Sequence, residues 1–144
     1  MHEFLQYTVE DVMSSPVVTV RPSTRLVEME ELFEKHGFNA FPVVDEVDQL
    51  VGVVGSMDLL KAFCFGEDTI LPPYDQIMQT EVKNVMQRDI HVVWPRTLLT
   101  RVVQKIVDTG CKSFPVVEDD RLTGMVSRED VIRALRRGVA GIRP

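Results

Sequence analysis

An internal duplication constrains the fold of this 144-residue chain more than any other feature of its sequence. Three pairs of segments align in order, the first two with a shift of 73 positions and the third with a shift of 72: 9–26 with 82–99, 37–44 with 110–117, and 50–60 with 122–132. The motif FPVV is identical in both copies. Self-similarity at a fixed offset is the signature of a duplicated structural unit. The chain is therefore a tandem repeat.

The first part of each copy predicts a short strand followed by a helix. A β-rich segment (17–20 or 90–93) leads into a proline, and Thr24 or Thr97 is expected to cap the next helix. Apolar residues then recur at helical spacing. These positions are Leu26, Met29 and Phe33 in the first copy and Leu99, Val102, Val103 and Ile106 in the second. Gly37 and Gly110 suit the left-handed conformation that ends such helices.

The second part of each copy predicts a hairpin and a closing helix. FPVV is a buried strand with its proline at the start, where a missing N–H is tolerated. An acidic turn leads to LVGVV or LTGMV and to a helix beginning at Met57 or Glu129. Each β-α-β-β-α copy of about 50–55 residues is too small to hold a full core alone. The predicted fold is α/β (α+β), with the two copies packed sheet to sheet about a pseudo-twofold axis.

The repeat also sets the expected boundaries. They are a lead-in at 1–8, the first copy at 9–62, a connector at 63–81, the second copy at 82–137 and a tail at 138–144. Pro72-Pro73 prevents one continuous helix through the connector. Its apolar residues Phe63, Phe65, Ile70 and Leu71 are expected to pack on the module or to form a surface for a partner.

Charge and composition narrow the class of protein. The net charge is −6, with 11 acidic and 3 basic residues in 1–60 but 7 acidic and 12 basic residues in 82–144. The acidic total argues against a nucleic-acid binder. The asymmetry favours self-association or an anion near the second half, or it reflects two solvated faces. Arginines 133, 136, 137 and 143 suit a helix end, although they are also able to contact nucleic acid.

Several classes of site and location are excluded or disfavoured. No secretory signal or membrane-length apolar run is visible, so a cytoplasmic protein is expected, without a membrane partner and with reduced Cys64 and Cys111. The three histidines and two cysteines have no metal-ligand spacing. No nucleotide-binding glycine loop or nucleophile elbow occurs, so we expect no catalysis.

The order M-x₂₋₃-P/D-h-x-x-V-x-P, then FPVV with an acidic turn, then G-h-V-x-x-x-D, resembles the CBS domain. It occurs twice in register over residues 9–137, as in a tandem CBS pair or Bateman module. The resemblance implies a stand-alone regulatory module rather than an enzyme. It also implies clefts for an adenosine-containing ligand (AMP, ADP, ATP or S-adenosylmethionine), a homodimer and a separate regulated protein partner.

The resemblance implies two clefts, each with a Ser/Thr-x-x-Asp motif from one copy and strand residues from the other. The primary cleft takes Met125, Ser127, Arg128 and Asp130, completed by Val18, Phe38, Asn39, Ala40 and Pro42. The secondary cleft takes Val53 and Asp58 with His91, Cys111, Lys112 and Pro115. Here Gly55 stands where the hydroxyl residue belongs, although Ser56 is adjacent, so the cleft of Asp130 ranks first.

The chemistry suits such a ligand independently of the resemblance. An ionised carboxylate only accepts hydrogen bonds, as a ribose diol requires, and a helix N-terminus suits a phosphate. However, Ser127 with Asp130 also forms the pattern of a capping box, which only starts a helix. Two alternatives therefore remain: a ligand-free dimerisation module, and a sensor of S-adenosylmethionine, for which Ser127 would matter less.

Overall fold

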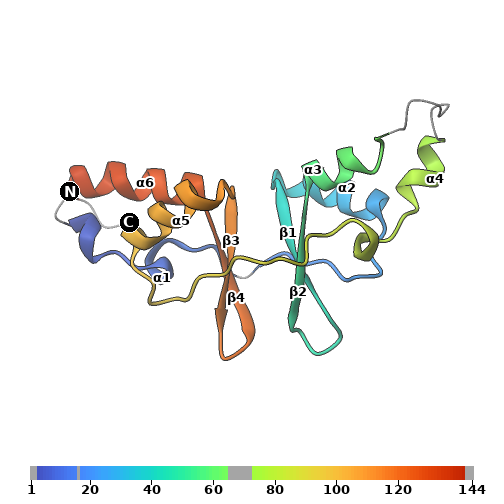
Figure 1. Ribbon diagram of the computed structural model, residues 1–144. Coiled ribbons are helices and arrows are strands. Elements are labelled where there is room, and N and C mark those ends of the chain that lie inside the picture. The colour runs from blue at the N-terminus through green and yellow to red at the C-terminus, as the bar shows by residue number, and fades with distance from the viewer. Residues whose placement is uncertain (1–2, 16, 65–72, 142–144) are drawn as a thin grey trace. The chain divides into compact units, whose positions relative to one another are not determined.

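The computed structural model describes residues 3–15, 17–64 and 73–141. They belong to two compact units. Unit 1 comprises Met1–Val17 and His91–Pro144, and unit 2 comprises Val18–Ile90. Both contain helices and a two-stranded antiparallel sheet, which confirms the expected α+β class (Figure 1).

Within each sequence copy, the helix, the hairpin and the closing helix follow in the predicted order. Unit 1 contains η1 (Glu3–Gln6), α1 (Val9–Val12), α5 (Leu99–Thr109), β3 (Ser113–Glu118), β4 (Arg121–Ser127) and α6 (Arg128–Val139). Unit 2 contains α2 (Leu26–His36), β1 (Ala40–Val44), β2 (Leu50–Gly55), α3 (Ser56–Lys61), α4 (Tyr74–Met78) and η2 (Val82–Asn84). None of the helices in the described ranges has the length and apolarity needed to cross a bilayer.

The hairpins and the helix ends agree with the sequence prediction. FPVV lies in β1 and again in β3, and the second strands are β2 and β4. Gly37 and Gly110 end α2 and α5 with φ values of 67° and 72°. The predicted first strands are reduced to a single parallel bridge each, Val20 to Val43 and Val93 to Val116.

The predicted helix caps at Thr24 and Thr97 are wrong. The helices begin after Arg25 and Leu98, and neither cap residue makes a side-chain cap hydrogen bond. The Thr24 hydroxyl instead accepts from the Arg21 amide at 2.9 Å, and the Thr97 hydroxyl accepts from the Trp94 amide at 3.0 Å. Each threonine thus closes the turn around the preceding proline, a local alternative to capping that is open to threonine.

The compact units do not coincide with the sequence copies, because the segments that lead into each copy are exchanged. The Val9 amide donates to the Thr97 carbonyl at 2.9 Å within unit 1. In unit 2 the Val82 amide donates to the Thr24 carbonyl at 2.7 Å. Val9 and Val82 are both fully buried. The first residues of one copy therefore complete the core built mainly by the other copy.

Each unit has its own hydrophobic core. Leu26 and Met29 are fully buried in unit 2, and Leu99 and Val102 are fully buried in unit 1, as the helical spacing predicts. Phe63 packs against the core of unit 2 and stacks on Tyr74, with ring centroids 5.8 Å apart. Phe65, Ile70 and Leu71 of the connector and Arg143 of the tail lie outside the described residues.

A glycine in the second strand of each unit allows the exchanged segment to approach. A Cβ on Gly124 would lie 2.7 Å from Met13 Sδ and 2.9 Å from the Ser14 carbonyl oxygen. A Cβ on Gly52 would lie 2.7 Å from Met86 Sδ and 3.0 Å from the Gln87 carbonyl oxygen. A side chain at either position would have to push the methionine thioether aside and press on a backbone oxygen, which explains the glycine of the G-h-V motif.

Candidate functional site: two carboxylates at helix starts

Asp130 lies in the first turn of α6, directly after β4. Its Oδ2 accepts from the Ser127 amide at 2.8 Å, and the Ser127 hydroxyl accepts from the Asp130 amide at 3.2 Å. Ser127 is extended, with φ −110° and ψ 166°. The capping box weighed in the sequence is therefore present. It fixes the carboxylate at the start of a 12-residue helix, where the N–H groups and the helix dipole favour negative charge.

The second oxygen of Asp130 is only weakly engaged. Its Oδ1 lies 3.4 Å from Nη1 of Arg133, one helical turn away, and the Arg133 side chain is 56% exposed. Exposed ion pairs at this distance contribute little, and the N–O separation exceeds that of a normal hydrogen bond. The Asp130 side chain retains 13% exposure. Oδ1 is therefore able to accept from another donor.

Arg128 is held by the end of the neighbouring helix. Its Nε donates to the Cys111 carbonyl at 2.9 Å, and its Nη2 donates to the Gly110 carbonyl. Its amide donates to the Lys112 carbonyl at 3.0 Å. The guanidinium thus satisfies carbonyls just beyond α5, a favourable position for a cation. With five N–H donors it keeps others for a ligand.

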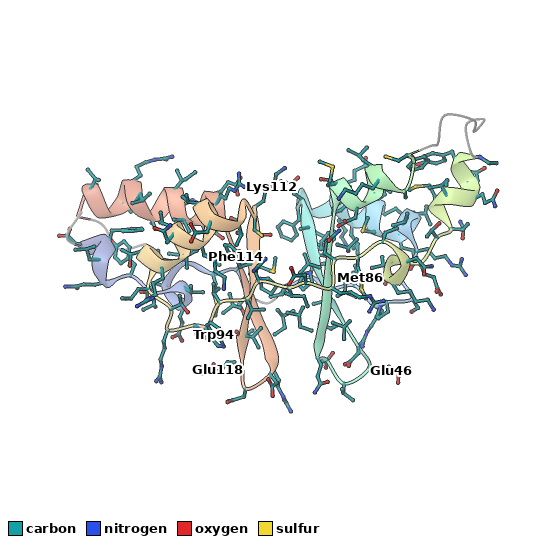
Figure 2. The ribbon with its side chains drawn as sticks, viewed as in Figure 1. Glu46, Met86, Trp94, Lys112, Phe114 and Glu118 are labelled. Carbon is teal, nitrogen blue, oxygen red and sulfur yellow. The ribbon has the colours of Figure 1, made fainter. Side chains whose placement is uncertain are left out.

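The remaining predicted residues of unit 1 lie on both strands of the hairpin and just before it, except for His91, which precedes α5. Met125 pairs with Pro115, which is buried, while Lys112 and His91 are exposed. Lys112 precedes β3 at the helix end of the hairpin, and Glu118 lies at the opposite end (Figure 2). Lys112 is thus close to the start of α6, where its charge faces solvent.

Asp58 in unit 2 occupies the equivalent place at the start of α3, yet its environment differs. The residue is 7% exposed. Its Oδ2 accepts from the Gly55 amide at 2.8 Å, and its Oδ1 accepts from Nε2 of Gln87, also at 2.8 Å. Both oxygens are occupied within the unit. Gly55 provides no hydroxyl, as its sequence indicates, and the Ser56 amide donates to the Asn39 carbonyl at 3.1 Å.

Unit 2 also contains the residues predicted to complete the primary cleft. Phe38 is 46% exposed and stacks on His36, with ring centroids 5.5 Å apart. Asn39 and Ala40 follow it into β1, Pro42 pairs with Val53, and Val18 packs against the core of the unit. Each unit therefore carries the carboxylate of one predicted cleft and the strand residues of the other. The composition of the two clefts stays a prediction.

Gln87 is the residue that the sequence analysis missed. The repeat contains a signal for it, because position 87 aligns with Ser14, a much shorter side chain. Nothing in the pattern predicts that the longer side chain reaches Asp58.

Among the residues the structure describes, no cluster of three or more His, Cys, Asp or Glu side chains suits a metal ion, and Cys64 and Cys111 are free.

Comparison with known proteins places these observations in a family. The CBS domain model matches residues 9–64 and again 82–137. An uncharacterised protein of Methanocaldococcus jannaschii, MJ1426, is 30% identical over 152 residues, with 88% of this chain and 90% of that protein covered. The chain spans only 22% of the L-aspartate semialdehyde sulfurtransferase of the same organism and 14% of the A-adding tRNA nucleotidyltransferase of Geobacter sulfurreducens, each 29% identical.

Solved structures support the same assignment. The structure of CBSX2 in complex with AMP has a TM-score of 0.77 and 30% identity, and covers 91% of this chain and 97% of that one. The CBS domain pair of MJ0100, solved with 5′-methylthioadenosine and S-adenosyl-L-methionine, has a TM-score of 0.77 and 26% identity, and covers 92% and 98%. With its duplicated motifs, its two α+β units and a family match over both copies, this chain belongs to the CBS domain family.

Proposed function

We propose that this protein is a regulatory module that binds an adenosine-containing nucleotide at Asp130. The observation that carries the proposal is the carboxylate of Asp130, which is fixed through Oδ2 while Oδ1 keeps the capacity to accept. A ribose offers two vicinal hydroxyl donors, and an ionised carboxylate only accepts. Two similar proteins were solved with AMP and with S-adenosyl-L-methionine, which both contain such a ribose.

The surroundings of Asp130 favour a ligand that also carries a phosphate. The N-terminus of α6 provides N–H groups and a positive dipole end, and Arg128 and Lys112 add positive charge at the same end of the hairpin. This favours AMP, ADP or ATP over S-adenosylmethionine. For the adenine, the resemblance to CBS pairs implies contacts with Val18, Phe38, Asn39, Ala40 and Pro42, and this part of the site stays a prediction.

The proposed output is a change in the conformation of the module rather than a chemical reaction. The ligand shifts the equilibrium between two conformations of the module, to an extent set by the difference in its affinity for each. A separate protein partner responds to the favoured conformation. We further propose that the protein acts in the cytoplasm as a homodimer, without catalytic activity or affinity for nucleic acid.

A thermal-shift panel tests the proposal. AMP, ADP, ATP, S-adenosylmethionine, NAD and GTP are each added to the wild type and to Asp130→Ala. A ligand present at 100 times its Kd stabilises the folded state by about 2.7 kcal/mol, which is readily measured. We expect an adenosine nucleotide to raise the melting temperature of the wild type but not of the variant. A shift that survives the substitution would transfer the site to Asp58.

The alternative is a ligand-free dimerisation module, which one observation favours. Leu60 and Ile132 occupy equivalent positions on α3 and α6, and they are 64% and 56% exposed. Apolar side chains repeated on the same helix face suit an interface. This function predicts no shift with any ligand in the panel. It also predicts a dimer mass in sedimentation experiments that Ile132→Glu reduces to the monomer mass.

A further inference from the structure

The side chain of Gln87 occupies the carboxylate that the secondary site would offer to a ligand. Gln87 Nε2 donates to Asp58 Oδ1 at 2.8 Å, and the Gly55 amide donates to Oδ2 at the same distance. Both distances lie within the range of good hydrogen bonds. Asp58 is 7% exposed, while Gln87 is an exposed residue. An exposed side chain thus donates to a carboxylate that is itself nearly buried.

The backbone holds Gln87 in position for this contact. Its amide donates to the Val53 carbonyl at 2.8 Å, and its carbonyl accepts from the Val53 amide at 2.9 Å. Gly52 allows the approach, because a Cβ there would lie 3.0 Å from the Gln87 carbonyl oxygen. A side chain that starts from a fixed backbone loses less freedom when it binds Asp58 than a free amide would.

The other unit provides an internal comparison. Ser14 makes the same pair of backbone hydrogen bonds, with Met125, at 2.8 and 3.1 Å. Its short side chain has no amide to extend toward Asp130, and Asp130 Oδ1 instead lies 3.4 Å from the exposed Arg133. The backbone geometry is thus conserved between the two units, and the side chain at this one position separates an occupied carboxylate from an available one.

We propose that Gln87 acts as a built-in competitor at the Asp58 site, so that each chain binds one adenosine nucleotide tightly, at Asp130, and a second one at least about tenfold more weakly. This inference rests on the proposed function, because it assumes that the ribose hydroxyls bind such a carboxylate. A ligand hydroxyl at Asp58 has to displace the Gln87 amide from Oδ1 or share that oxygen with it. A hydrogen bond to a charged group is among the stronger ones in proteins, so its displacement weakens binding by about tenfold or more.

Exchange of the two side chains tests this inference. Isothermal titration with AMP is expected to give one tight site per chain in the wild type, two in Gln87→Ser, and one again in Gln87→Ser/Asp58→Asn. The reciprocal variant Ser14→Gln is expected to weaken binding at Asp130 by about tenfold, since it introduces the same amide there. Ser14 is exposed, so the longer side chain fits without disturbing the core.

The outcomes separate this inference from the proposed function. One site in both the wild type and Gln87→Ser, with unchanged affinity in Ser14→Gln, overturns the role of Gln87 and leaves the Asp130 site intact. No binding in the wild type overturns the Asp130 site. In that case, if Gln87→Ser gains one site and the double variant Gln87→Ser/Asp58→Asn loses it again, the role of Gln87 as a competitor at Asp58 is retained. If Gln87→Ser binds nothing either, both ideas fail.

The contact itself can also be measured without a ligand. In nitrogen–proton correlation spectra, we expect the side-chain amide signals of Gln87 to be displaced from random-coil positions and to return toward them in Asp58→Ala. Ser14→Gln should acquire a similarly displaced pair of signals. Random-coil signals for Gln87 in the wild type would overturn the inference.

Discussion

At the scale of single residues, the two copies differ where each closing helix begins. Ser127 caps α6 with its hydroxyl, whereas Gly55 precedes α3 with no side chain. Ser127→Ala is expected to lower the free energy of unfolding by about 1 kcal/mol, but Ser127→Gly by only a few tenths, because glycine tolerates the cap conformation. Urea titration measures both. No loss in Ser127→Ala would mean that the hydroxyl bond does not stabilise the helix.

Gly124 gives a second prediction at this scale. A methyl group there would lie 2.7 Å from Met13 Sδ and 2.9 Å from a backbone oxygen, and only the thioether can move aside. Gly124→Ala should therefore destabilise the fold by about 1–3 kcal/mol, the usual range for overpacking. Calorimetric melting of Gly124→Ala and of the matched Gly52→Ala checks this. An unchanged melting temperature in both would contradict the close approach.

Much of the candidate site could be predicted at this scale, because the repeat aligns Asp58 with Asp130 and shows Gly55 in place of a hydroxyl residue. The contacts that Gln87 and Arg128 make could not be predicted from the sequence. Gln87 reaches Asp58 across 29 positions of sequence, and Arg128 reaches back 17 positions to Cys111. Local sequence patterns carry no information about such long-range side-chain contacts, because these depend on tertiary packing.

At the scale of elements, the short helix η1 has a larger role than its place in a lead-in suggests. Phe4 is 3% exposed in the core of unit 1, and its Cβ approaches Gly138 of α6. Phe4→Ala should cost about 3–5 kcal/mol, as is usual for a buried aromatic residue. Chemical unfolding measures the loss. The neighbouring Leu5, 56% exposed, provides the control, with a change for Leu5→Ala of about 0.5 kcal/mol or less.

The elements that the sequence predicted well are those with strong local signals. Alternating or continuous apolar runs located the hairpins, and Gly37 and Gly110 located the helix ends. The caps were wrong because Thr24 and Thr97 have two local choices, a helix cap or a turn. The proline two residues earlier favours the turn.

At the scale of the whole molecule, the first residues of each copy are exchanged between the two units, and this exchange leads to a distinctive prediction. Val9 and Val82 are fully buried, each in the core of the unit formed mainly by the other copy. Replacing either by alanine removes about two methylene equivalents, or roughly 1.6 kcal/mol before any cavity cost. Val9→Ala should speed amide hydrogen exchange in α5 and α6, and Val82→Ala should speed it in α2. Faster exchange in α2 for Val9→Ala instead would contradict the exchange of segments.

The sequence could not have predicted this exchange, because an alignment of copies shows which segments are alike and not which of them pack together. Val9 and Val82 are interchangeable in the alignment. Tertiary contacts, such as the hydrogen bonds from Val9 to Thr97 and from Val82 to Thr24, reveal that each segment joins the other copy.

The measurement that tests the central claim most directly is isothermal titration of AMP into the wild type, Asp130→Asn and the matched Asp58→Asn. Asparagine preserves an oxygen that accepts from the helix-start amide, so the capping is largely retained while the carboxylate is lost. We predict that the wild type and Asp58→Asn bind AMP equally well and that Asp130→Asn does not bind it measurably. Undiminished binding in Asp130→Asn, or none in the wild type, would contradict the proposal that Asp130 holds the nucleotide.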